Sequence, residues 1–155
     1  MSDATYKYGG ARALVALHEE QLLEFLDVWK KTKAANLSLP KTKDTDYESL
    51  ETLLHHVLRA ARGYMVWMCE QLDLPDPAID EAPTLNKVEA QADAYARHLL
   101  ERWRLPLVSV EASKFGPDTY VSNWNTPYCI DAMLEHAVMH PLRHSFQLRN
   151  LLQTL

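Results

Sequence analysis

Cysteine is scarce in this sequence, and the two that occur, Cys69 and Cys129, stand far apart. They form neither a CxxC pair nor a repeated spacing, so the sequence indicates neither a disulfide framework nor a zinc–thiolate knuckle. We expect both to be free, buried thiols in a reducing compartment. Long apolar runs are also missing, both at the length of a membrane span and at the length of a signal-peptide core. We therefore predict a cytoplasmic protein with no membrane partner.

Positive charge is sparse and scattered. Lysine and arginine together number 16, against 21 acidic residues, which gives a formal net charge of -5. Phosphate binding needs clustered positive charge, so a nucleic-acid partner is disfavoured. The sequence also contains no HExxH motif, no glycine-rich phosphate loop and no nucleophile elbow. A di-iron carboxylate bundle is excluded because no glutamate is followed by histidine three residues later.

The chain has 155 residues, of which 47% are hydrophobic. It is long enough for one domain with its own core and too short for two, so we predict a single domain over residues 1–155. Apolar residues recur at spacings of three and four in four segments, a pattern typical of amphipathic helices. The predicted helices cover residues 11–32, 46–72, 85–103 and 127–152. The sequence thus predicts an all-α fold, a four-helix bundle.

Local signals predict two of the helix starts. Thr45 and Glu48 form a capping-box pair ahead of the second helix. Thr126 followed by Pro127 is a favourable cap and first-turn combination for the last helix. Residues 104–125, between the third and fourth helices, are long for a structureless connection, and we expect a short strand or turn there that covers part of the molecule.

Histidine is the residue type that distinguishes the last predicted helix. His136, His140 and His144 recur at every fourth position, so their rings share one helix face. Two histidines at this spacing can ligate one divalent ion. Three buried imidazoles without a ligand would leave several ring nitrogens without partners. The pattern therefore favours a metal site over simple burial.

A further ligand is expected from another helix, and the adjacent His55 and His56 of the second helix offer one. Periodicity does not choose between them, because each lies about 130° from the middle of that helix's apolar stripe. His18, on the apolar stripe of the first helix, could also approach the ion. A core histidine with its hydrogen bonds satisfied is the more common case for such a position.

Three other residues have expected surroundings. His98 lies on the polar side of the third helix, and we expect it to be solvated. Tyr64 and Trp67 share part of the second helix's surface with His56 and could line a pocket beside it.

The histidine-containing segment LLHHVLRAA, followed by a last helix that reads HxxxHxxxHxxQL, resembles the DinB/YfiT-like family of small bacterial metal-binding bundles. The resemblance extends over the whole chain in length and helix order. It implies an up-down-down-up bundle with a three-histidine site formed by His56, His140 and His144. By the same resemblance, His136 and Gln147 become candidates for supporting contacts to the ligands.

Two features depart from the family pattern. The residues HSF at 144–146 stand where the family often has His-Arg-Gly or a similar small-residue step. Pro141 follows a proposed ligand directly, removes one backbone hydrogen bond and is expected to bend the helix. The pair His136 and His140 therefore remains an alternative to His140 and His144.

Three imidazoles around one divalent ion leave coordination positions open for water or substrate. The resemblance implies a use for them, because the family includes enzymes that activate low-molecular-weight thiols such as bacillithiol or mycothiol. We therefore predict a thiol-dependent, transferase-like metalloenzyme that acts on a small molecule in stress or detoxification. The alternatives are a non-catalytic metal-binding sensor or interaction module, and a metal-hydroxide hydrolase. No catalytic acid or base is identified.

The identity of the ion is less constrained than its ligands. Imidazole donors suit zinc, nickel, copper and iron alike. We predict one zinc or nickel ion, with iron, manganese or copper as alternatives. The resemblance also implies a homodimer.

Overall fold

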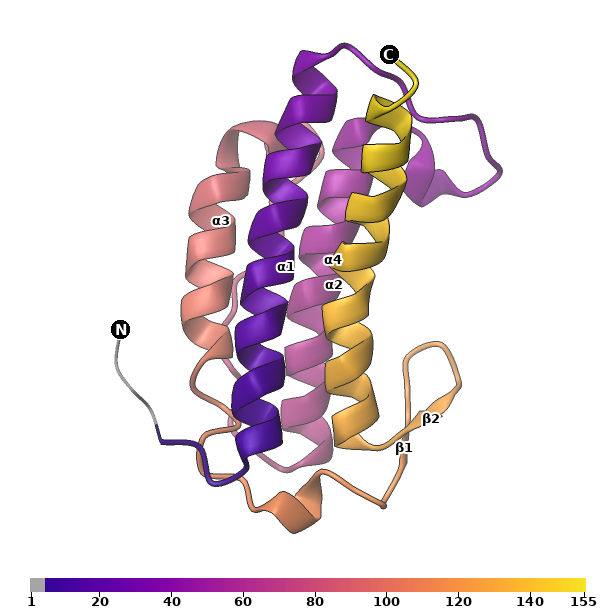
Figure 1. Ribbon diagram of the computed structural model, residues 1–155. Helices are drawn as coiled ribbons and strands as arrows, with labels where there is room; N and C mark the ends of the chain where they lie inside the picture. Colours follow the sequence, from indigo (N-terminus) through magenta and orange to yellow (C-terminus); the bar gives the residue numbers. More distant parts are fainter. Residues whose placement is uncertain (1–4) are drawn as a thin grey trace.

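The computed structural model describes residues 5–155, and this part of the chain is mainly helical (Figure 1). Its helices are α1 (Gly9–Ala34), α2 (Leu50–Gln71), α3 (Val88–Trp103) and α4 (Ile130–Leu152). Two short 3-10 turns, η1 (Thr45–Tyr47) and η2 (Ala112–Lys114), and an antiparallel pair of strands, β1 (Tyr120–Val121) and β2 (Pro127–Tyr128), lie between them. The all-α prediction is confirmed. Within residues 5–155 no helix has the length and apolar character needed to cross a membrane.

Contacts between the helix ends show the direction in which each helix runs. The Tyr8 hydroxyl, just before α1, donates to Asp131 in the first turn of α4 at 3.0 Å. Lys33, at the end of α1, pairs with Glu51 at the start of α2 and lies 3.7 Å from Glu89 at the start of α3. Accordingly, α1 and α4 run in one direction and α2 and α3 in the other (Figure 1).

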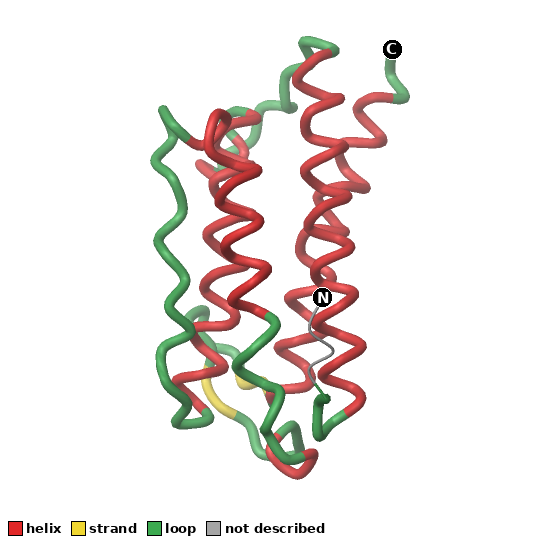
Figure 2. The backbone as a smooth tube through the Cα atoms, turned by 90° about the vertical axis from the view of Figure 1, so that its left-hand side faces the viewer, coloured by secondary structure: helices red, strands yellow, loops and turns green. Residues whose placement is uncertain are grey.

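Because α2 and α3 run the same way, the chain must return between them. Residues 72–87 do so as an extended segment along the outside of the bundle (Figure 2). The Tyr95 hydroxyl of α3 donates to the Asp80 carbonyl at 2.8 Å, and the Asp80 amide donates to His98 Nε2 at 3.0 Å. The expectation that His98 is solvated is correct in part: its side chain is 28% exposed, and its Nε2 accepts the hydrogen bond from this segment.

The core lies between the four helices and contains the apolar stripes that the periodicity predicts. Its largest fully buried side chains include Phe25, Leu54, Leu58, Met65, Leu99 and Trp103. Two buried indoles connect helices through hydrogen bonds: Trp29 donates to the Leu50 carbonyl at 2.7 Å, and Trp103 donates to the Ala61 carbonyl at 2.9 Å. A buried N–H without an acceptor costs about 1–3 kcal/mol, so these bonds favour the observed seating of α1 and α3 on α2.

His18 belongs to this core. It is 1% exposed, and its ring stacks on Trp103 with the ring centroids 3.7 Å apart. Among the described residues neither ring nitrogen has a hydrogen-bond partner, and burial lowers the pKa of His18 to about 3. The expectation of satisfied hydrogen bonds is therefore wrong for His18, whose ring packs against Trp103 while both of its nitrogens are buried without a partner.

The predicted start of the second helix is wrong. Thr45 begins the 3-10 turn η1, in which Asp44 accepts a hydrogen bond from the Asp46 amide at 2.9 Å. The helix α2 begins after Ser49, whose side chain and that of Thr52 form the capping box. The threonine hydroxyl performs the role that glutamate usually has in this motif, so the sequence holds two competing signals four residues apart.

The predicted start of the last helix is also wrong. Thr126 and Pro127 belong to a β-hairpin, in which the Ser122 amide donates to the Thr126 carbonyl at 2.8 Å. The cap of α4 is Cys129, whose sulfur accepts from the Ala132 amide at 3.5 Å. The residues that would form an additional first turn of α4 instead pair their backbone N–H and C=O groups across the hairpin. The short strand expected within residues 104–125 is present as β1.

Both cysteines are free, as expected, but their burial differs. Cys69 is buried in α2, and burial raises the pKa of its thiol to about 11. Cys129 is only half-buried, because its capping position lies at the surface end of α4. The expectation of two buried thiols is therefore correct for Cys69 alone.

Candidate metal centre

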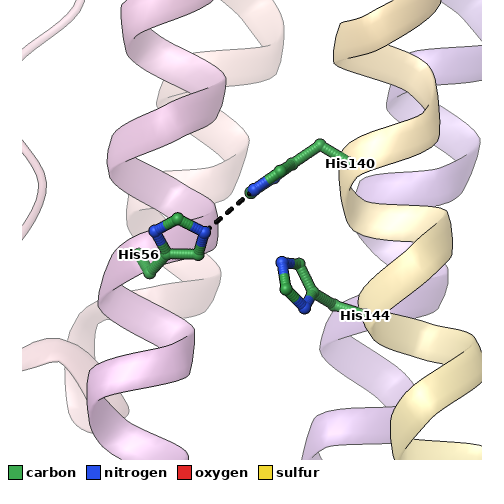
Figure 3. Close-up of side chains that lie close together, drawn as sticks. All are labelled: His56, His140 and His144. Carbon is green, nitrogen blue, oxygen red and sulfur yellow. Dashed lines mark hydrogen bonds between the residues drawn. The ribbon is translucent and has the colours of Figure 1, made fainter. Parts of the chain in front are cut away.

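Three histidines from two helices point toward one another across the space between α2 and α4 (Figure 3). His56 comes from α2, and His140 and His144 stand one turn apart on α4. One ring nitrogen of each residue lies within 4.8 Å of the others, and the Nε2 atoms of His56 and His140 are 2.9 Å apart. With metal–nitrogen bonds near 2.1 Å, neighbouring donors lie about 3.0–3.4 Å apart. The group could therefore hold one metal ion.

The surroundings of all three imidazoles favour the neutral form, which is the form that ligates metals. His140 is 8% exposed and His144 is 1% exposed, while His56 is half-buried. Burial lowers the pKa of each, and the neighbouring imidazoles add to the effect at His140, where the pKa is about 2. A metal ion can thus bind without displacing protons at neutral pH.

Gln147 orients one of the three rings. The His144 Nδ1–H donates to Gln147 Oε1 at 2.9 Å, across a single turn of α4. Because this bond uses the Nδ1 proton, Nε2 keeps its lone pair for an ion. The prediction that Gln147 supports a proposed ligand is confirmed.

Asp46 approaches the site from η1, and the sequence had not indicated it. Its Oδ2 lies 3.2 Å from His56 Nδ1, outside hydrogen-bond geometry. Burial lowers the pKa of His56, and the negative charge of Asp46 opposes part of that effect. A carboxylate beside a histidine is a common support for a metal ligand. The 3-10 turn positions Asp46, and helical periodicity carries no signal for such a residue.

His136 does not join the group of three. Its ring stacks on Trp124 with the centroids 5.1 Å apart and meets the ring of Tyr64 edge-on at 5.4 Å. The structure thus does not bring the alternative pair, His136 and His140, together around one centre with a histidine of α2. The helix α4 is continuous through Pro141, and the bend expected there stays a prediction.

His55 points away from the group. Its Nδ1–H donates to the Pro83 carbonyl at 2.9 Å, in the returning segment between α2 and α3. Adjacent residues of a helix differ by about 100° in direction, so only one of the two neighbouring histidines can face α4. In this structure that residue is His56.

A cavity of about 350 Å³ opens beside His56. Its lining consists of His56, Arg59, Ala60, Gly63, Tyr64, Trp67, Asn123, Trp124 and Met133. The prediction that Tyr64 and Trp67 line a pocket is confirmed. Trp124, which the sequence had not indicated as a wall, comes from the loop between β1 and β2. A larger hollow of about 530 Å³ lies beside Tyr47 and Gln147 and is not lined by the three histidines.

No protein-family model, curated protein or solved structure matches this chain. The chemistry of the site therefore rests on the arrangement of the chain's own side chains.

Two tyrosines stand near the histidines: Tyr47 lies 5.5 Å from His144 and Tyr64 lies 5.8 Å from His140, measured between ring centroids. Burial raises the pKa of both phenols, so both stay protonated and neutral at physiological pH.

Replacing Gln147 with leucine is expected to weaken zinc binding by about 10–100-fold, because the ring of His144 loses the contact that sets its orientation and tautomer. Competition with a chromophoric chelator measures the affinity. Asn150→Leu is the matched control, since it removes an amide one turn further along α4 without touching the histidines. An affinity that is unchanged in Gln147→Leu would contradict the supporting role.

Proposed function

We propose that this protein is a DinB/YfiT-type, up-down-down-up helical bundle in which His56, His140 and His144 hold one divalent metal ion. The observation that carries the proposal is the convergence of three neutral imidazoles, with donor nitrogens within 4.8 Å of one another. The helix directions support the bundle type. Three protein donors leave positions open, which is typical of catalytic rather than structural sites.

The proposed ion is zinc or nickel, both of which accept imidazole donors. From the sequence resemblance to the DinB/YfiT-like family, we propose that the protein is a homodimer. We also propose that it works in the cytoplasm. Its proposed substrate is a small molecule with a thiol group. A divalent ion in this position supplies positive charge that lowers the pKa of a bound thiol or water.

The surroundings of the histidines favour a thiol over water as the reactant. The residues that line the adjacent cavity include no carboxylate, and the one histidine among them is a proposed ligand. A reactant that loses its proton easily suits this cavity, because its lining offers neither a carboxylate nor a free histidine as a general base. An ordinary thiol has a pKa near 8.5 and water one near 15.7.

The proposed reaction transfers a carbon group from a second reactant to the sulfur of the bound thiol. The thiol's proton passes to solvent. The sulfur then forms a bond to an electrophilic carbon of the second reactant while the leaving group of that carbon departs with the bonding electron pair. Gln147 holds the ring of His144 through its hydrogen bond, and Asp46 places a negative charge beside His56. The aromatic side chains limit access of water to the reactants.

The proposal is tested with cobalt-substituted protein. We expect a new near-ultraviolet charge-transfer band when 2-mercaptoethanol is added, and no band with 2-(methylthio)ethanol, which cannot form a thiolate. A variant with serine at positions 69 and 129 removes any signal from the chain's own thiols. His140→Ala should lose both the cobalt and the band. Cobalt binding without a thiol band would instead favour a metal-binding sensor or interaction module.

A further inference from the structure

The cavity beside His56 is lined in part by two small residues of α2, Ala60 and Gly63. Gly63 lies in the interior of α2, two turns after His56. A Cβ atom built at Gly63 meets nothing within 4 Å. Glycine in a helix interior costs about 1 kcal/mol relative to alanine, and here the residue fits no turn or close backbone contact. Together with Ala60, Gly63 leaves open space where a larger side chain would stand.

The walls of this cavity are aromatic. Tyr64 and Trp67 come from α2, while Trp124 reaches over from the hairpin loop and stands at 87° to the Tyr64 ring, 6.4 Å away. The Trp67 indole donates to the Val121 carbonyl at 3.1 Å, which fastens the hairpin to α2. Trp124 remains 44% exposed. These faces suit a flat or apolar body, and aromatic contacts of this kind contribute about 0.5–1.5 kcal/mol each.

The rim of the cavity carries a positive charge. Arg59, one turn after His56, lines the opening and is exposed. Within residues 5–155 the Arg59 guanidinium makes no ion pair, and no lining residue is acidic. A guanidinium presents two parallel N–H donors that match a carboxylate.

We propose that this cavity binds a small organic carboxylate. The carboxylate pairs with Arg59, and the apolar or aromatic body lies over Gly63 against Trp124. A volume of about 350 Å³ falls at the lower end of the usual range for small-molecule sites. The ligand's role as a substrate rests on the proposed function, because the cavity opens on His56. Binding of the carboxylate itself does not require the ion.

The first test measures the charge preference. Calorimetric titration of metal-free and zinc-loaded protein with 3-phenylpropanoate and with 3-phenylpropanamide should show the acid binding about tenfold more tightly in both forms. Arg59→Gln should remove that preference and leave binding of the amide unchanged. Arg12→Gln, an exposed arginine on α1, controls for the change in net charge. Equal affinities for the acid and the amide in the unmodified protein would overturn the proposal.

The second test fills the cavity. Gly63→Leu should lower the affinity for both probes more than tenfold while zinc stoichiometry and the circular dichroism stay unchanged. Gly63→Ala is the matched control, because its single methyl group leaves most of the space open. Undiminished probe binding in Gly63→Leu would overturn the cavity as the binding place. Probe binding by a protein that takes up no zinc would contradict the proposed function and leave this inference standing.

Discussion

Alanine at position 140 is expected to reduce zinc affinity at least a hundredfold and to leave the helical circular dichroism nearly unchanged. His140 is one of the three proposed donors, so its loss should exceed the roughly 10–100-fold effect of a supporting contact. The fold should persist because the apolar stripes, not the ion, stabilise the bundle. His56→Ala and His144→Ala should behave alike. Elemental analysis of untagged protein, combined with chelator competition, measures stoichiometry and affinity.

His55→Ala is the control for that experiment. It removes an imidazole adjacent to His56 in sequence, but the ring is already bound to the Pro83 carbonyl. We expect little change in zinc affinity. Full metal retention in the variants at positions 140 and 144 would remove the proposed site. A loss confined to His55→Ala would show that the register of α2 toward α4 differs from the structure.

Acid is expected to destabilise the fold through His18. Its folded-state pKa is about 3, below the usual 6.5, and burial is the sole cause. Between these pH values the unfolded chain binds a proton at His18 that the folded chain does not. The contribution of neutral His18 to the free energy of unfolding is therefore fully present above about pH 6.5 and falls as the pH decreases toward 3. At about 1.4 kcal/mol per pH unit, the loss at pH 4 is about 3 kcal/mol.

Urea unfolding of the wild-type protein and of His18→Leu at pH 7 and pH 4 measures this effect. Leucine has a similar volume and no titrating nitrogen, so the variant should lose about 3 kcal/mol less than the wild type over this interval. The comparison cancels the contribution of the other buried histidines, which both proteins share. Equal losses in the two proteins would show that charging of His18 does not limit stability in acid.

Features that lie within one helix could be predicted from the sequence. The number of helices, the end of α4 and the common face of His140, His144 and Gln147 all follow from a repeat of 3.6 residues. The Gln147 bond to His144 joins residues three apart, which are neighbours on any helix. No distant segment is needed to bring such side chains together.

Local end signals were less reliable. The pair at Thr45 and Glu48 and the pair at Thr126 and Pro127 are both sound cap patterns, yet α2 begins after Ser49 and α4 after Cys129. In each case a second capping residue lies a few positions downstream. The choice between such neighbours depends on where the preceding chain is held, here by the turn η1 and by the hairpin, and this information is not local.

The sequence by itself determined the helices and placed three histidines on one face of α4. Only the tertiary structure decided which residues meet. The residues alone left His55 and His56 equivalent, and the resemblance selected His56. In the structure α2 packs between α4 and the returning segment, so the ring of His56 faces His140 and the ring of His55 faces Pro83. The physical reason is that periodicity reports which face of a helix is buried. It does not report which distant segment buries that face.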